Sequence, residues 1–168
     1  MTNLSPANTL LAEPISPSAF LPYGDIVENK TAQRRRDVPL AFQMHGVPLT
    51  PELWVNRLPR HGLTRALVDV LESHPYSSQT FIPMQPSRCM VVVALADGNG
   101  EPDVGTLRAF VTAPGQGVCY RHAVWHYTFL SLDSANEVAV TLGTTGRNDD
   151  TLIVRLPDAI DVNISVAV

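Results

Sequence analysis

The sequence predicts an all-β protein, built as an antiparallel sandwich or barrel. Three observations indicate this class. Short apolar or alternating segments follow one another at close spacing, Gly, Pro, Asn and Asp mark the turns between them, and no segment has a convincing long helical period. The chain has 168 residues, of which 45% are hydrophobic, so a single domain over residues 1–168 can bury a substantial core.

The N-terminal residues 1–19 predict an extended lead-in. Prolines at positions 6, 14 and 17 disfavour a helix there, although Ser16 or Ser18 could cap one brief helical turn. Residues 20–28 predict a Pro/Gly turn that runs into a short strand. Residues 29–51 give no clear signal for either kind of element.

The segment 63–73 is ambiguous. Its leucines fit one face of a helix, and periodicity alone favours the helix, although the alternation from Arg65 to Leu71 also fits a strand. His74 and Pro75 end the element, because the residue before a proline disfavours the helical region. Since the clear elements around it are strands, the segment is predicted to be a strand.

The other predicted strands lie between recognisable turns. Residues 88–95, RCMVVVAL, are apolar and β-branched, which is typical of a strand buried on both faces. Turns are predicted at 97–100, DGNG, and at 114–117, PGQG. The remaining expected strands cover residues 52–57, 79–83, 107–111, 118–120, 125–132, 137–142 and 152–156.

Composition argues against several classes of protein. The formal charge of −4 lacks the basic footprint of a nucleic-acid binder, and the short run Arg34–Arg36 is explained more cheaply as a solvated loop. No apolar run approaches the about 18 residues of a membrane span, and no signal peptide is evident. We therefore expect a cytoplasmic protein without membrane or nucleic-acid partners. Cys89 and Cys119 are expected to be small buried residues.

Titratable, polar and aromatic side chains that could take part in catalysis are concentrated between residues 105 and 129. His122 and His126 lie there, four residues apart, with Trp125 between them. In a strand this even spacing would place both imidazoles on one face. A histidine beside a tryptophan can equally be a satisfied core residue, and His122 can equally be a surface residue.

Four blocks of this sequence resemble the ureidoglycolate lyase family, also called ureidoglycolate hydrolases. The family consists of small cupin-fold enzymes of allantoin degradation, a part of purine metabolism. The resemblance implies a cupin-like antiparallel β-barrel, that is, a double-stranded β-helix or jelly roll. The matching blocks are FLPYGDIVE (20–28), HPYSSQTFIPM (74–84), VVVAL (91–95) with LRAFV (107–111), and QGVCY (116–120) with VWH (124–126).

The last block departs from the family pattern. The family usually has Gly-x-Trp-His-His-Pro, whereas this chain has AVWHYT from Ala123 to Thr128. The turn glycine, the second histidine and the proline are all replaced. Such changes can leave the fold intact while they alter substrate preference or metal affinity.

The resemblance also implies a divalent metal, nickel in some family assignments. His74, Gln79 and His126 would be its ligands, with Tyr76 where a second histidine of the first cupin motif would stand. Imidazoles suit a divalent transition metal, but this set is thinner than the usual three His and one Glu. A metal-free site is an equal alternative.

Further site residues are expected around this centre. Arg57 or Arg108 would bind the substrate carboxylate through a bidentate guanidinium, and Arg57 is favoured because Asn56-Arg57 resembles an Asn-Arg pair of the family. His122 and Gln79 are candidate substrate-binding residues. Tyr120 is a candidate catalytic residue, although a tyrosine there is more often part of a core.

The predicted reaction is the cleavage of (S)-ureidoglycolate to glyoxylate and urea by a carbon–nitrogen lyase. A histidine suits both proton transfers, and His126 and His74 are the candidates. Three alternatives stay open: a hydrolase that releases ammonia, a non-catalytic cupin-like protein that binds a small carboxylate, and a structural barrel whose histidines are incidental. Unpaired strand edges further predict a homodimer.

Overall fold

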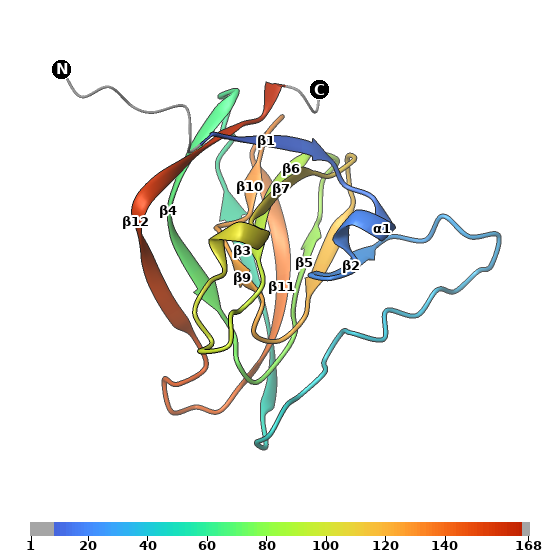
Figure 1. The fold of residues 1–168 in the computed structure, drawn as a ribbon. Coiled ribbons are helices and arrows are strands. Elements are labelled where there is room, and N and C mark those ends of the chain that lie inside the picture. The colour runs from blue at the N-terminus through green and yellow to red at the C-terminus, as the bar shows by residue number, and fades with distance from the viewer. Residues whose placement is uncertain (1–8, 166–168) are drawn as a thin grey trace.

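The computed structural model describes residues 9–165, which form a β-barrel of two sheets (Figure 1). The described part contains a short helix, α1 (Pro17–Phe20), a 3-10 turn at Val104–Thr106, and twelve strands. The strands are β1 (Thr9–Pro14), β2 (Gly24–Val27), β3 (Thr50–Leu58), β4 (Arg65–Ser73), β5 (Gln79–Pro83), β6 (Cys89–Ala94), β7 (Arg108–Val111), β8 (Gly117–Tyr120), β9 (Trp125–His126), β10 (Leu130–Ser131), β11 (Asn136–Thr144) and β12 (Leu152–Asn163).

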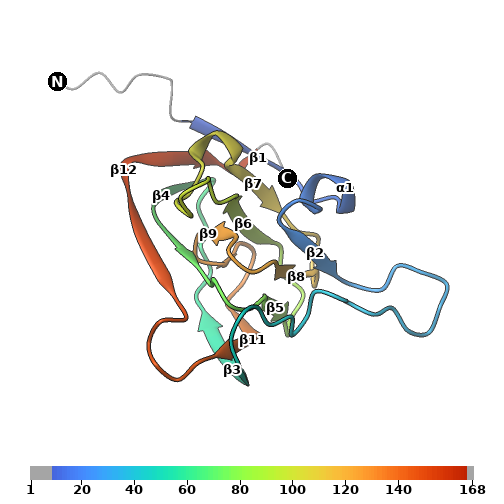
Figure 2. The ribbon, with the colours of Figure 1, turned by 60° about the horizontal axis from the view of Figure 1, so that its bottom comes forward.

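The larger sheet closes on itself. Its seven strands have the order β10-β6-β7-β1-β12-β4-β9, and β9 also pairs with β6. Figure 2 shows β9 between β4 and β6, where it completes the ring. The pairings are antiparallel except those of β1, which runs parallel to both β7 and β12. The predicted antiparallel barrel is therefore confirmed, with one parallel strand added.

The smaller sheet packs against one side of this ring. Its order is β2-β8-β5-β11-β3, so β2 and β3 form its edges. Trp54, Val140, Phe81 and Val118 pair across β3, β11, β5 and β8 in a single row. The long excursion at 28–49 leaves the barrel after β2 and returns at the start of β3 (Figures 1 and 2).

Strand β6 separates two hydrophobic cores. Because side chains alternate along a strand, Met90, Val92 and Ala94 enter one core, and Cys89, Val91 and Val93 enter the other. All six side chains are buried, as the apolar run predicted. The second core lies between the two sheets and forms the base on which the candidate site rests.

Residues 65–73 form a strand, as predicted. Burial alternates over the first part of β4, with Val68 fully buried and Leu67 63% exposed, and the buried positions then shift by one residue to Leu71 and Ser73 beside the irregularity in β12. The helical spacing of the leucines was coincidental, because β4 pairs with β12 and β9 along its length.

Three boundaries differ from the prediction. Residues 9–14 are the strand β1, and not an extended lead-in, because β7 and β12 supply partners far away in the sequence; residues 1–8 of that lead-in lie outside the described residues. The expected strand 125–132 is divided into β9 and β10. The expected strand 152–156 continues to Asn163 through an irregularity between Arg155 and Ile160.

The predicted helical turn is present as α1. Ser16 precedes it with an extended backbone, and its Oγ accepts a hydrogen bond from the backbone N–H of Ala19. No helix within residues 9–165 combines the length and the apolar character that a membrane crossing requires.

Candidate active site

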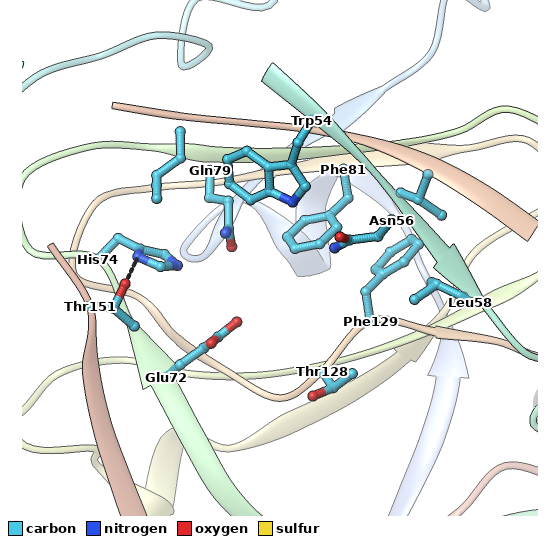
Figure 3. Close-up of a pocket in the computed structure, with 12 residues that line it drawn as sticks. Trp54, Asn56, Leu58, Glu72, His74, Gln79, Phe81, Thr128, Phe129 and Thr151 are labelled. Atoms are coloured by element: carbon cyan, nitrogen blue, oxygen red, sulfur yellow. Dashed lines mark hydrogen bonds between the residues drawn. The ribbon is translucent and has the colours of Figure 1, made fainter. Parts of the chain in front are cut away.

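A cavity of about 360 Å³ opens between the inner face of the smaller sheet and the ends of β4 and β9 (Figure 3). Strands β3, β4, β5 and β11 supply most of its wall, and the segments that follow β9 and precede β12 complete it. Its lining residues are Trp54, Asn56, Leu58, Glu72, His74, Gln79, Phe81, Thr128, Phe129, Val138, Leu142 and Thr151.

Glu72 and His74 line one end of this cavity, and the buried His126 forms a compact cluster with them without lining the cavity itself. Glu72 and His74 are two residues apart at the end of β4 and share a side of the chain. Strand β9 places His126 directly opposite Glu72. One donor atom from each side chain lies within 4.8 Å of the other two, and the imidazole rings are 5.4 Å apart between centroids.

Hydrogen bonds fix the orientation of both imidazoles. Nδ1 of His74 is 3.0 Å from the carbonyl oxygen of Asp150, and Nδ1 of His126 is 3.1 Å from that of Val124. Because a carbonyl oxygen only accepts, each Nδ1 carries the proton. In the neutral rings, Nε2 therefore presents a lone pair to the cavity end.

The cluster is consequently rich in electron pairs. Nε2 of His126 lies 3.2 Å from Oε1 of Glu72, yet neither this Nε2 nor that of His74 has an aligned hydrogen-bond partner. Lone-pair atoms that face one another repel, so a hydrogen-bond donor or a cation among them stabilises the cluster. The arrangement therefore suits a bound proton, a metal ion or a donor group of a substrate.

The environment of the cluster shifts the pKa values of His74 and Glu72 and so sets which of the two is charged. Burial, reinforced by the neighbouring His126, lowers the pKa of His74 to about 4. Contact with His126 lowers the pKa of Glu72, although burial opposes this effect. Near neutral pH, His74 is thus neutral and Glu72 is ionised.

Gln79 and Tyr120 support this end of the cavity from β5 and β8. The two residues pair across the strands. Oε1 of Gln79 is buried and has no hydrogen-bond partner, so it is available to a ligand. The Tyr120 ring stacks on His126 with centroids 4.4 Å apart, and burial raises the pKa of its hydroxyl well above the ordinary value. Tyr120 therefore fixes the imidazole plane and stays protonated.

The donor set suits a divalent transition metal. Two imidazoles and a carboxylate are typical ligands of such ions. Each imidazole also donates its Nδ1–H to a backbone carbonyl, as metal-bound histidines commonly do with the ring nitrogen that does not bind the metal. The buried, unpartnered Nε2 atoms thus fit the metal that the family resemblance implies.

Three residues expected at the site lie elsewhere in the structure. Arg57 follows Asn56 on β3 and points to the opposite face, where its side chain is 85% exposed and pairs with Glu137. Arg108 pairs with Glu13 and lies over the ring of Phe110. His122 stacks on His45 with centroids 3.8 Å apart, and it does not line the cavity.

Glu72 was missed by the sequence reasoning. Its signal was the spacing Glu-x-His at the end of an alternating segment, which places both side chains on one face only if the segment is a strand. Trp54 and Asn56 were missed for a related reason, because alternation along β3 turns them inwards and Arg57 outwards.

The departures in the last block have separate structural consequences. Ala123 adopts φ of 60°, in the left-handed region that favours glycine. Tyr127 packs against the core around Trp125, so its replacement of a histidine removes no group from the cavity. Thr128 lines the cavity directly.

Comparisons with known proteins agree on one family. The sequence model described as ureidoglycolate lyase matches residues 7–163. A relative in Agrobacterium fabrum is 33% identical over 157 residues, which cover 94% of this chain and 96% of its own length. Proteins named ureidoglycolate lyase are 33% identical in Burkholderia mallei, over 83% of this chain and 86% of theirs, and 39% identical in Escherichia coli O139:H28, over 68% of this chain and 74% of theirs.

A solved structure, RmlC from Streptococcus suis in complex with dTDP-D-xylose, aligns with 57% of this chain and 44% of its own at 9% identity and a TM-score of 0.37, too distant a likeness to inform the site. The family match and the curated relatives span nearly all of the described fold. This chain belongs to the ureidoglycolate lyase family.

Proposed function

We propose that this protein is a carbon–nitrogen lyase that cleaves (S)-ureidoglycolate to glyoxylate and urea. One observation carries the proposal: in a chain of the ureidoglycolate lyase family, the unpartnered Nε2 atoms of His74 and His126 and the Glu72 carboxylate converge at the end of a cavity. Acid–base groups within reach of one another at a cavity wall are what this elimination requires.

The reaction needs two proton transfers. Loss of the hydroxyl proton allows the C–O bond to become a carbonyl while the C–N bond breaks, and the departing ureido nitrogen takes up a proton. The Glu72–His126 pair accepts the hydroxyl proton and returns it to the nitrogen. Because Tyr120 stacks on His126 and Val124 binds its Nδ1, the reactive Nε2 is held in place.

His74 has a different role in this scheme. With its pKa lowered to about 4, it stays neutral, and its Nε2 accepts a hydrogen bond from the substrate. The amides of Gln79 and Asn56 bind the carboxylate and ureido groups from the other strands of the cavity. Arg57 is left out of this assignment because its side chain points away from the cavity.

Glu72, His74 and His126, with Gln79 beside them, would also hold a divalent metal, nickel by family resemblance. A metal bound there would act as a Lewis acid that lowers the pKa of the substrate hydroxyl. The orientation of both imidazoles by backbone carbonyls serves either form of the site.

Substitution of the cluster tests the proposal. We expect His126→Ala and Glu72→Gln each to reduce kcat for urea release by at least about 100-fold, which is the usual contribution of a positioned acid–base group. His45→Ala, outside the cavity lining, is the matched control and should retain activity. Wild-type urea release by His126→Ala would refute the assignment.

We further propose that the protein acts as a cytoplasmic homodimer in allantoin degradation. The pathway is the one that the family resemblance implies, and the location is the one expected from the sequence. For the dimer, support comes from β3, an edge of the smaller sheet whose Leu53 and Val55 side chains are 70% and 53% exposed.

A further inference from the structure

The cavity has two chemically different halves (Figure 3). Glu72, His74 and Gln79 converge at one end, which is the reacting end proposed above. At the other end lie the apolar side chains of Leu58, Phe81 and Phe129. In the assignment proposed above, the substrate contacts the first half and Asn56, and it uses none of these apolar side chains.

The volume of the cavity exceeds what ureidoglycolate fills. At about 360 Å³, the space lies within the range of about 300–1,000 Å³ found for pockets that hold much larger molecules, whereas ureidoglycolate has about nine non-hydrogen atoms. A small polar substrate would therefore leave the apolar end to water.

The apolar end is walled by an aromatic pair. The rings of Phe81 and Phe129 stack on each other, with an interplanar angle of 18° and centroids 5.1 Å apart, so a ligand can contact only their edges and outer faces. Both rings are buried, and Leu58 is half-buried beside them. Flat faces and apolar edges favour an aromatic or alkyl group, whose transfer from water is favourable there.

An unsubstituted ureido group matches this end poorly. If the hydroxyl-bearing carbon lies at the Glu72–His74–His126 cluster, the ureido group extends along the cavity and its distal nitrogen approaches the phenylalanines. Asn56 and Thr128 are the polar lining residues on that side. A terminal NH₂ would exchange its hydrogen bonds to water for one amide and one hydroxyl in an otherwise apolar surrounding.

We infer that the substrates of this enzyme include ureido hydroxy acids whose distal nitrogen carries a planar apolar substituent. This inference rests on the proposed function. The chemistry is unchanged: the hydroxyl proton moves to the proximal ureido nitrogen, the C–N bond breaks, and glyoxylate and a substituted urea leave. No oxidant, reductant or further reactant is needed.

The test compares ureidoglycolate with its N-phenyl analogue, the adduct of glyoxylate and phenylurea, in assays of glyoxylate release. We expect kcat/KM for the phenyl compound to equal or exceed that for ureidoglycolate. A phenyl compound that is turned over more than about 100-fold less efficiently would overturn the inference, since a poorly fitting apolar group costs a factor of this size. Turnover of neither compound would instead refute the proposed function.

A pair of variants locates the effect in the apolar half. Leu58→Gln should lower the ratio of kcat/KM for the phenyl compound to that for ureidoglycolate by about tenfold, because it makes the wall polar. Leu67→Gln makes the same exchange at an exposed position on β4 and should leave the ratio unchanged. An equal ratio in wild type and Leu58→Gln would contradict the inference even if the phenyl compound is cleaved.

Discussion

The positions of two imidazole protons determine what the site can do. The carbonyl groups of Asp150 and Val124 hold Nδ1–H of His74 and His126, so both Nε2 atoms face the Glu72 carboxylate. Neither backbone acceptor depends on a particular side chain. The arrangement is therefore a property of the chain path around the cavity, and it makes the cluster ready to bind a proton or a cation.

The buried neutral imidazole of His74 gives a pH-dependent stability. Its pKa falls from 6.5 in the unfolded chain to about 4 in the folded protein, mainly through burial. The unfolded state thus binds more protons between these values, and the free energy of unfolding should fall as the pH is lowered from 6.5 to 4. The lowered pKa of Glu72 acts in the same direction at still lower pH.

Urea denaturation over this pH range checks the effect. The His74→Gln variant lacks the titrating group, so its unfolding midpoint should decline less steeply than that of the wild type between pH 6.5 and 4. Parallel declines in the two proteins would show that His74 is not the group responsible.

Ala123 occupies a backbone position suited to glycine. At a φ of 60°, a residue with a Cβ is strained by about 1–2 kcal/mol relative to glycine. Glycine loses more conformational freedom on folding, and this loss offsets part of the difference. Ala123→Gly should raise the free energy of unfolding by about 0.5–1 kcal/mol. In the extended strand β11, the control Ala139→Gly should lower it. Loss of stability in Ala123→Gly would show that the left-handed backbone is not strained.

Among the elements, β4 decides whether the site exists at all. As a strand, it places Glu72 and His74 on one side and buries alternate residues; as a helix, it would separate them. Val68→Ala should therefore cost about 2 kcal/mol, as for a buried aliphatic truncation, and Leu67→Ala less than about 0.5 kcal/mol. Equal losses in urea denaturation would contradict the alternation.

A strand or turn could be predicted from the sequence where its own residues determine its conformation. The buried run of β6 and the turn after it follow from their residues, whereas β1 is stabilised by β7 and β12, which are distant from it in the sequence. The strand expected over residues 152–156 continues to Asn163, because β12 accommodates Pro157 and Asp158 where its register shifts between Arg155 and Ile160.

The candidate site was predictable only in part. His74, Gln79 and His126 were expected at the centre, and the structure brings them together. Glu72 and Asn56 could not be selected without knowing which side of each strand faces inwards. Arg57 was preferred because Asn56-Arg57 resembles an Asn-Arg pair of the family, although alternation on β3 turns its side chain to solvent.

At the scale of the whole molecule, the closed ring of the larger sheet and the open smaller sheet have different structural roles. The ring of the larger sheet encloses one core, and the smaller sheet covers the second core and supplies most of the cavity wall. The smaller sheet has two edges, β2 and β3, and β3 presents exposed apolar residues. Its outer edge is thus the place where the proposed dimer would form.

The introduction of charged residues at the exposed apolar positions of β3 tests the dimer. Leu53→Lys combined with Val55→Lys should convert the protein to a monomer in analytical ultracentrifugation, because buried lysines would oppose association. The matched variant Leu67→Lys, exposed on β4, should leave the dimer intact. A wild-type protein that sediments as a monomer at all concentrations would contradict the proposal.

The identity of the products formed from (S)-ureidoglycolate tests the central claim most directly. Product analysis with purified protein, both metal-stripped and reloaded with nickel, should yield urea and glyoxylate in equal amounts without ammonia, and Glu72→Gln should abolish both in parallel. Ammonia in place of urea, or tight binding of ureidoglycolate without any turnover, would contradict the assignment of this protein as a carbon–nitrogen lyase.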